Sequence, residues 1–165
     1  MKKLFLTAAI AVFGFSVINA QSGLKAGAHV ALPIGDSGDY SSVSIGLDVA
    51  YLVAVSDQFS VGGATGFTNA IAKSYDFLGA SIKGDDVQFV PVAGAARFNA
   101  TEEFYVGADL GYAVGINDNN DGGFYYRPRV GYSFTDMIGA NFSYTGISRD
   151  GGSWSTIGVG IEFSF

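Results

Sequence analysis

The sequence predicts an all-β fold, an eight-stranded antiparallel up-and-down barrel, on three observations. Apolar residues alternate with small or polar residues in one segment after another, which is the period of a β-strand. The chain has 24 glycines and 15% aromatic residues but only three prolines, a composition that favours many strands over helices. The connections between the segments alternate between short and long, as they do in barrels that cross a membrane.

The N-terminus has the layout of a secretory signal peptide. Two lysines lie within residues 1–3, residues 4–17 are apolar, and Ala20 precedes the expected cleavage site. The apolar stretch is shorter than the roughly 20 residues that a membrane-spanning helix needs, so an uncleaved anchor is the weaker alternative. We expect residues 1–20 to be removed and residues 21–165 to form one outer-membrane barrel domain.

The first three predicted strands each carry one mainly apolar face. The positions between the apolar residues hold mainly glycine, serine and single charged residues, so each strand has two different faces. A long connection of about residues 33–42 separates the first two strands, and a short turn at 55–58 separates the second and third. Taking every second residue, the apolar positions run from Leu24 to Leu32, from Val43 to Val53 and from Phe59 to Phe67.

The fourth predicted strand, about Val87 to Phe98, is apolar at both odd and even positions. It contains Pro91, which cannot donate a backbone hydrogen bond to a neighbouring strand, and a β-bulge there would switch the facing of the strand. We expect the even positions to face outward, because the odd set would place Arg97 on the apolar side.

The last four predicted strands return to clear alternation. Short turns at 99–102 and 135–137 join the fourth strand to the fifth and the sixth to the seventh, and longer connections span about 69–86, 117–123 and 148–153. Because the strand number is even, both ends of the barrel domain fall on the side of the short turns. The apolar positions run from Phe104 to Val114, from Phe124 to Phe134, from Ile138 to Tyr144 and from Ile157 to Phe165.

The composition of the two faces predicts that the barrel lies in a membrane. In the seven clear strands the apolar face carries no charged residue, and the opposite face is mostly glycine, alanine and serine, which suits a narrow interior. A Lys or Arg on a lipid-facing position at mid-membrane costs about 2–4 kcal/mol, so this absence of charge is expected if the apolar face meets lipid. Aromatic residues near the strand ends are typical of the girdles at the two membrane surfaces.

The C-terminal segment adds a further pattern. Ile161, Phe163 and Phe165 alternate up to the last residue, and this ending resembles the signal that the outer-membrane assembly machinery recognises. Over residues 21–165 the chain resembles the small eight-stranded outer-membrane β-barrels, the class of the OmpA transmembrane domain and of OmpX. The resemblance implies a location in the outer membrane of a Gram-negative bacterium, contact with its lipid and lipopolysaccharide, and the assembly machinery as a partner during biogenesis.

The inward positions of the strands hold a nearly balanced set of charges. An eight-stranded barrel is only wide enough for side chains to fill, and buried charges need partners. We therefore expect a salt-bridged interior, and a narrow or gated path for ions is the functional alternative. The expected members of this network are Lys25, His29, Asp48, Arg97, Asp109, Arg127, Arg129 and Glu162.

Catalysis, metal binding and nucleic-acid binding find little support in the residues. His29 is the only histidine and there is no cysteine, so we expect a satisfied interior histidine, no catalytic group and no cofactor. Residues 117–122 are rich in Asn and Asp, but the position where a calcium loop needs Glu holds Pro128, so we expect a turn. The net charge of −6, with scattered basic residues, disfavours nucleic acid.

The connection of about residues 69–86 is the candidate contact loop, with Tyr75, Phe77, Leu78 and Ile82 as its exposed apolar residues. It either packs on itself or extends two strands as a protruding hairpin, which would be an adhesive edge in OmpX-like proteins. We expect a non-enzymatic outer-membrane protein with a structural or adhesion-like role and a surface partner for its loops. A pore is the alternative, followed by a membrane-embedded enzyme and a soluble lipocalin-like carrier.

Overall fold

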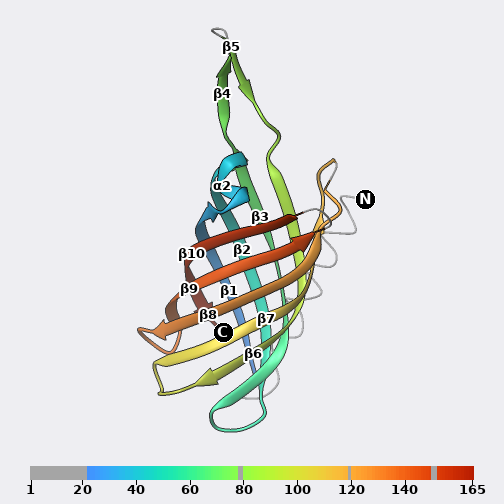
Figure 1. The fold of residues 1–165 in the computed structure, drawn as a ribbon. Helices are drawn as coiled ribbons and strands as arrows, with labels where there is room; N and C mark the ends of the chain where they lie inside the picture. Colours follow the sequence, from blue (N-terminus) through green and yellow to red (C-terminus); the bar gives the residue numbers. More distant parts are fainter. Residues whose placement is uncertain (1–21, 78–79, 119, 150–151) are drawn as a thin grey trace, which may run out of the picture.

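The structure, a computed structural model, describes residues 22–77, 80–118, 120–149 and 152–165. Eight antiparallel strands close into one barrel (Figure 1), which confirms the predicted fold class. The proposed signal peptide lies outside the described residues. The barrel strands are β1 (Ser22–Ile34), β2 (Ser41–Ala54), β3 (Phe59–Ala72), β6 (Val87–Asn99), β7 (Phe104–Gly115), β8 (Gly123–Ser133), β9 (Ile138–Arg149) and β10 (Gly152–Ser164).

Each barrel strand pairs with the barrel strand before and after it in the chain, and β1 closes the ring against β10. The short turns and the C-terminus lie at one end, which we call the short-turn end; the opposite end is the long-loop end. At the long-loop end, a short helix, α2 (Asp36–Tyr40), joins β1 to β2. Among the described residues, no helix has the length and hydropathy needed to cross a membrane.

The fourth barrel strand, β6, runs without a bulge past Pro91. Its register with β7 is continuous, and Pro91 lies on the buried side together with Arg97, whereas Val92 is 60% exposed on the outside. The ladder between β3 and β6 has a gap opposite Pro91, where this residue has no N–H to donate. Thr65 Oγ1 donates a hydrogen bond to the carbonyl oxygen of Pro91 at 2.8 Å. The even positions of this strand face outward, in agreement with the expectation.

Two of the expected long connections differ from the prediction. Residues 69–86 are only partly a connection, because β3 continues to Ala72 and a separate hairpin of β4 (Ser74–Phe77) and β5 (Ala80–Lys83) follows. Of the two alternatives that the sequence left open for this segment, the structure has the protruding hairpin. This hairpin projects beyond the barrel (Figure 1). The connection expected at 148–153 is also shorter, since Arg149 still pairs with Gly152. Ladder hydrogen bonds come from the backbone, so strands continue through polar segments in which the apolar alternation stops.

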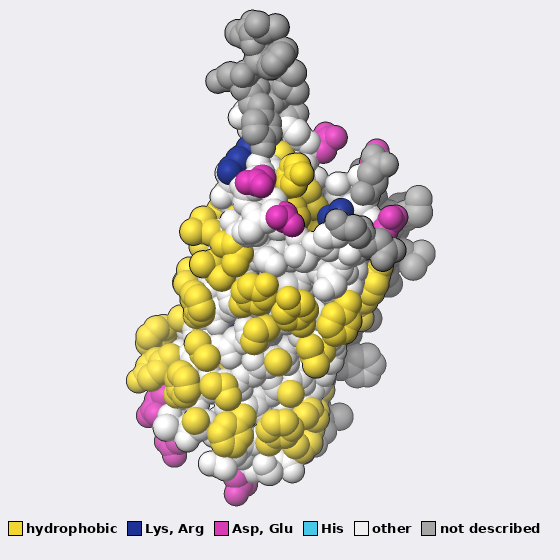
Figure 2. Space-filling view, in the orientation of Figure 1, with side chains coloured by type: hydrophobic (Ala, Val, Ile, Leu, Met, Phe, Trp, Pro, Cys, Tyr) yellow, Lys and Arg dark blue, Asp and Glu magenta, His cyan; other side chains and the backbone are white. Residues whose placement is uncertain are grey.

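A belt of exposed apolar side chains surrounds the outside of the barrel. Figure 2 shows this belt on the visible face, with acidic side chains gathered beyond its lower and upper edges. Leu47 at the middle of β2 is 61% exposed, and its partners Ala28 and Phe67 also face outward. An exposed apolar surface of this extent marks contact with a membrane or with another apolar partner.

The apolar part of the interior lies toward the long-loop end. Phe89, Tyr125, Ile147 and Trp154 come from four different strands and form a buried apolar cluster with two alanines. The rings of Phe89 and Trp154 lie 5.9 Å apart at an angle of 54°. We call these four residues the apolar plug, because they fill the barrel above its charged interior.

Glycines on the inward face leave room for large side chains from the next strand. The ring of Tyr105 lies directly over Gly131, where an added Cβ atom would overlap its ring carbons. We expect Gly131→Val to lower the free energy of unfolding by about 1–3 kcal/mol through overpacking. Urea unfolding of the barrel in lipid vesicles measures this loss. Gly152→Val is the matched control because, apart from Gly152 and its chain neighbours, no atom of the described residues lies within 4 Å of its Cβ position; equal stability of the two variants would contradict the packing.

Candidate functional site

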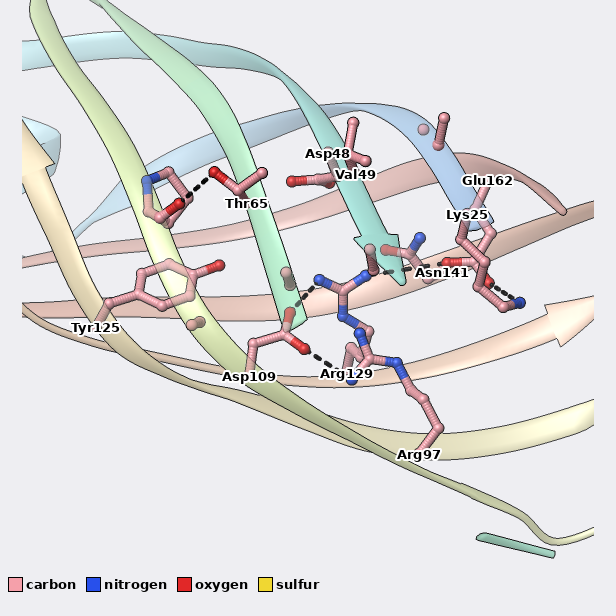
Figure 3. A pocket seen from close by; sticks show the side chains of 16 residues that line it. Lys25, Asp48, Val49, Thr65, Arg97, Asp109, Tyr125, Arg129, Asn141 and Glu162 are labelled. Atoms are coloured by element: carbon pink, nitrogen blue, oxygen red, sulfur yellow. Dashed lines mark hydrogen bonds and ion pairs between the residues drawn. The ribbon is translucent and has the colours of Figure 1, made fainter. Parts of the chain in front are cut away.

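The barrel interior holds the charged residues that the sequence singled out. They come from β1, β2, β6, β7, β8 and β10 and form three groups inside the barrel, and Figure 3 shows the groups around Asp109 and Glu162. Each lies on the inward face of its strand, so the groups form only when the sheet closes. We describe the groups by their central carboxylates, Asp109, Glu162 and Asp48.

The Asp109 group is the most deeply buried, since Asp109 is only 1% exposed. Arg97 Nη1 lies 2.7 Å from Oδ1 of Asp109, and Arg129 Nη2 donates a hydrogen bond to Oδ2. Arg97 Nη1 also donates to the carbonyl oxygen of Ala96 at 2.8 Å. Two guanidinium groups thus share one carboxylate. All three charges can be buried away from water because each has an opposite charge as a partner.

The Glu162 group adjoins it toward the short-turn end. Lys25 Nζ donates to Glu162 Oε1 at 3.0 Å, and Tyr105 Oη donates to Oε2 at 3.1 Å. Arg129 Nη1 lies 3.9 Å from the same carboxylate and links this group to the Asp109 group. The ring of Tyr105 also lies between two cations, with Lys25 Nζ at 5.7 Å and Arg97 Cζ at 5.9 Å from its centroid.

The Asp48 group contains the single histidine. His29 Nδ1 lies 2.9 Å from Asp48 Oδ2, and Arg127 Nη1 donates to Oδ1 at 2.7 Å. Arg127 Nε also donates to Ser143 Oγ at 3.1 Å. The other ring nitrogen of His29 has Thr68 Oγ1 at 3.5 Å, so both nitrogens face polar atoms of the wall.

The space enclosed between these groups is too small for a substrate, although a cleft of about 790 Å³ opens at the short-turn end and reaches Lys25, Arg97 and Tyr105. The interior cavity next to Asp109 and Glu162, and the one beside His29, each have a volume of about 20 Å³. A cavity of that size holds roughly one water molecule. His29 has a carboxylate and a hydroxyl as neighbours, but no room for a reacting molecule. The geometry therefore supports a pairing network rather than a catalytic one.

The side chains inside the barrel also bear on the alternative hypothesis that the protein is a pore. The apolar plug and the three charged groups fill the described interior beyond the cleft at the short-turn end, and we expect the barrel not to conduct ions. Single-channel recording in a planar bilayer tests this, and it should show no discrete conductance steps above the bare membrane. Regular steps that scale with protein concentration would contradict a filled interior.

The sequence did not single out Tyr105 or the apolar plug. The signal was present, because Tyr105 shares the inward parity of Asp109, and Tyr125 shares that of Arg127. In the sequence, aromatic residues are interpreted only as members of the outer girdles, so these two inward tyrosines receive no role. Inward parity is the stronger indicator, since the outer face of a membrane barrel and its interior both accept aromatic rings.

The long-loop end is built around α2. Ser155 N donates to Ser37 Oγ at 2.8 Å, and Lys73 Nζ donates to the carbonyl oxygen of Gly38, so helix α2 is tied to β10 and to the end of β3. Beyond it, the backbone register of the hairpin pairs Tyr75 with Ile82 and Phe77 with Ala80. Leu78, the remaining member of the candidate contact loop, lies outside the described residues.

The C-terminal strand closes the ring. Ile161 pairs with Ala28 of β1, and the backbone N–H of Phe165 donates to the carbonyl oxygen of Leu24 at 2.9 Å. Ile161, Phe163 and Phe165 are all exposed on the outer face of the barrel. The proposed assembly signal is therefore an apolar row on the strand that completes the sheet.

Solved structures of other proteins have the same architecture. Yersinia pestis Ail in a phospholipid nanodisc is 16% identical, with a TM-score of 0.63 over 89% of this chain and 100% of Ail. The fold is that of the small eight-stranded outer-membrane β-barrels. The N-terminal barrel domain of Pseudomonas aeruginosa OprF is 18% identical, with a TM-score of 0.52 over 88% of this chain and 98% of that domain. The resemblance to the OmpA and OmpX class is thereby confirmed at the level of the fold.

A third structure of this barrel class has a ligand. Ail in complex with the heparin analogue sucrose octasulfate is 15% identical, with a TM-score of 0.60 over 90% of this chain and 100% of Ail. No family model and no curated protein sequence matches the chain. At these identities the likeness concerns the fold, and the role of this barrel has to come from its own residues.

Proposed function

We propose that this protein is a non-enzymatic integral protein of the outer membrane of a Gram-negative bacterium, with an adhesion-like role. The observation that supports it best is the exposed apolar belt around the barrel, of which Leu47 is a central member. Such a belt is stable against lipid and is a liability in water. In this proposal the apolar row that ends at Phe165 is read by the assembly machinery, after export through residues 1–20.

The long-loop end is the surface that meets a partner. Both described ends of the chain lie at the short-turn end, so the projecting hairpin of β4 and β5 lies on the outside of the cell. Within the described residues these two strands pair only with each other, and each keeps one edge with free backbone groups. A free strand edge outside a membrane is suited to pairing with an extended segment of another protein.

The charge of this end decides which partner fits. The loops at the long-loop end contain more acidic than basic residues, and their bases are Lys73, Lys83 and Arg149. A sulfated polyanion such as the one bound to Ail would be repelled here, so we propose a neutral or basic protein surface. The acidic residues of the loops at the long-loop end would contact the lipopolysaccharide of the protein's own membrane through bridging cations. In the sequence these residues are Asp36, Asp39, Asp76, Asp85, Asp86, Asp118, Asp121 and Asp150.

The hairpin is tested by shortening it. Replacing residues 74–83 with a short Gly-Ser linker leaves the barrel strands intact, and we expect cells that display this variant to lose attachment to protein-coated surfaces. The matched control replaces residues 117–121 in the neighbouring loop with a linker of the same kind and should keep attachment. Equal attachment by both variants, at equal surface amounts, would remove the hairpin from the proposed function.

A further inference from the structure

A cleft lies at the long-loop end above the apolar plug. Its volume is about 510 Å³, within the range of roughly 300–1,000 Å³ that is usual for small-molecule sites. We call it the outer vestibule and define it by six lining residues. They are Asp36, Lys73, Asp85, Val87, Arg149 and Trp154.

The floor of the outer vestibule is apolar and firmly supported. Trp154 is 6% exposed and packs on Phe89, which is itself buried in the plug. Val87 at the start of β6 contributes the rest of the apolar floor. An apolar group that enters the vestibule therefore meets a preformed surface that needs no rearrangement.

The rim carries two carboxylates and two cations from separate elements. Asp36 comes from α2, Lys73 follows β3, Asp85 precedes β6, and Arg149 ends β9. Asp36, Asp85 and Arg149 make no ion pair or hydrogen bond with their side chains among the residues that the structure describes. Lys73 is held at the α2 wall by its hydrogen bond to the carbonyl oxygen of Gly38.

The apolar floor and the four rim charges together determine which class of ligand fits the vestibule. A polyanion would face Asp36 and Asp85, a polycation would face Lys73 and Arg149, and an uncharged apolar molecule would leave all four charges in water. A molecule with one positive end, one negative end and an apolar group satisfies both the rim and the floor. Free short peptides have this chemistry.

We propose that the outer vestibule is a binding site for short free peptides, with the charged termini on the rim and an apolar side chain on Trp154. The site differs from the hairpin contact proposed above, because the described residues that line it come from the barrel, from α2 and from the segments that flank the hairpin. Binding is expected at equilibrium without transport, since the apolar plug closes the barrel below the vestibule.

The chain has a single tryptophan, and it forms the floor of this site, so its fluorescence reports binding directly. The probe is the dipeptide alanyl-phenylalanine, added to the protein purified from membranes in detergent. We expect a saturable fluorescence change that weakens about tenfold when the peptide is N-acetylated or C-amidated, the effect of losing one charge-assisted hydrogen bond.

Variants separate the rim from the rest of the barrel. Asp85→Asn and Arg149→Gln should each weaken binding about tenfold, whereas Asp57→Asn at the short-turn end should leave it unchanged. The heat-induced mobility shift on gels confirms that each variant is folded. Two results would overturn the proposal: no saturable change in the folded protein, or equal affinity for the free and the blocked dipeptides. Neither result depends on whether the hairpin has a surface partner.

Discussion

Replacing Asp109 with leucine should destabilise the barrel by about 3–5 kcal/mol, the usual cost of breaking a buried ion pair on one side. The carboxylate of Asp109 is the ion-pair partner of both Arg97 and Arg129. Without it, Arg97 has no ion-pair partner among the described residues, although its side chain stays buried. Two guanidinium groups then face each other in the middle of the barrel with one compensating carboxylate, Glu162, near one of them.

Urea unfolding in lipid vesicles, followed by the fluorescence of Trp154, measures this effect. Asp57→Leu is the matched control, because Asp57 lies in an exposed turn and should change stability by less than about 0.5 kcal/mol. Adding Arg97→Met and Arg129→Met to Asp109→Leu should recover most of the loss, since the three replaced side chains are then neutral and need no charged partners. A stable Asp109→Leu variant would show that the three charges do not depend on one another.

Replacing Leu47 with arginine should cost about 2–4 kcal/mol when the barrel is in a bilayer. Leu47 is 61% exposed at the centre of the outer belt, so in a water-soluble barrel the same change would replace one exposed side chain with another. In lipid, the guanidinium group has to leave water or drag water into the membrane. The expected loss therefore arises from the solvent and not from any contact within the protein.

Tyr40→Arg is the control for this substitution, because Tyr40 is 66% exposed but lies in α2 at the long-loop end, outside the belt. Both variants are unfolded with urea in vesicles of the same lipid. We expect a loss for Leu47→Arg and almost none for Tyr40→Arg. Equal stability of the two variants would mean that Leu47 does not face the hydrocarbon.

The alternation of residue types was sufficient to predict the eight barrel strands and their facing. Even in β6, where both parities are apolar, the single charge of Arg97 indicated which side is inward. The partners inside the barrel could not be predicted in the same way. That Asp109 meets both Arg97 and Arg129 depends on the register and closure of the sheet, which alternation along one strand does not determine.

The long-loop end was the least predictable part. The hairpin of β4 and β5 has too few residues for a clear alternating pattern, and α2 is a single turn tied down by Ser37 and Lys73. Contacts of this kind bring together residues that are distant in the chain. Trp154 and Val87, which both line the outer vestibule, are an example. Candidate sites made by such contacts become visible only when the barrel is closed.

The most direct test of the membrane assignment is to fractionate expressing cells and to run the outer-membrane fraction on SDS gels, boiled and unboiled. We predict that the protein is found in this fraction and that its band changes mobility on boiling, because a closed barrel resists SDS until it is heated. A protein that stays in the soluble fraction without detergent, and whose band does not shift, would contradict the outer-membrane barrel.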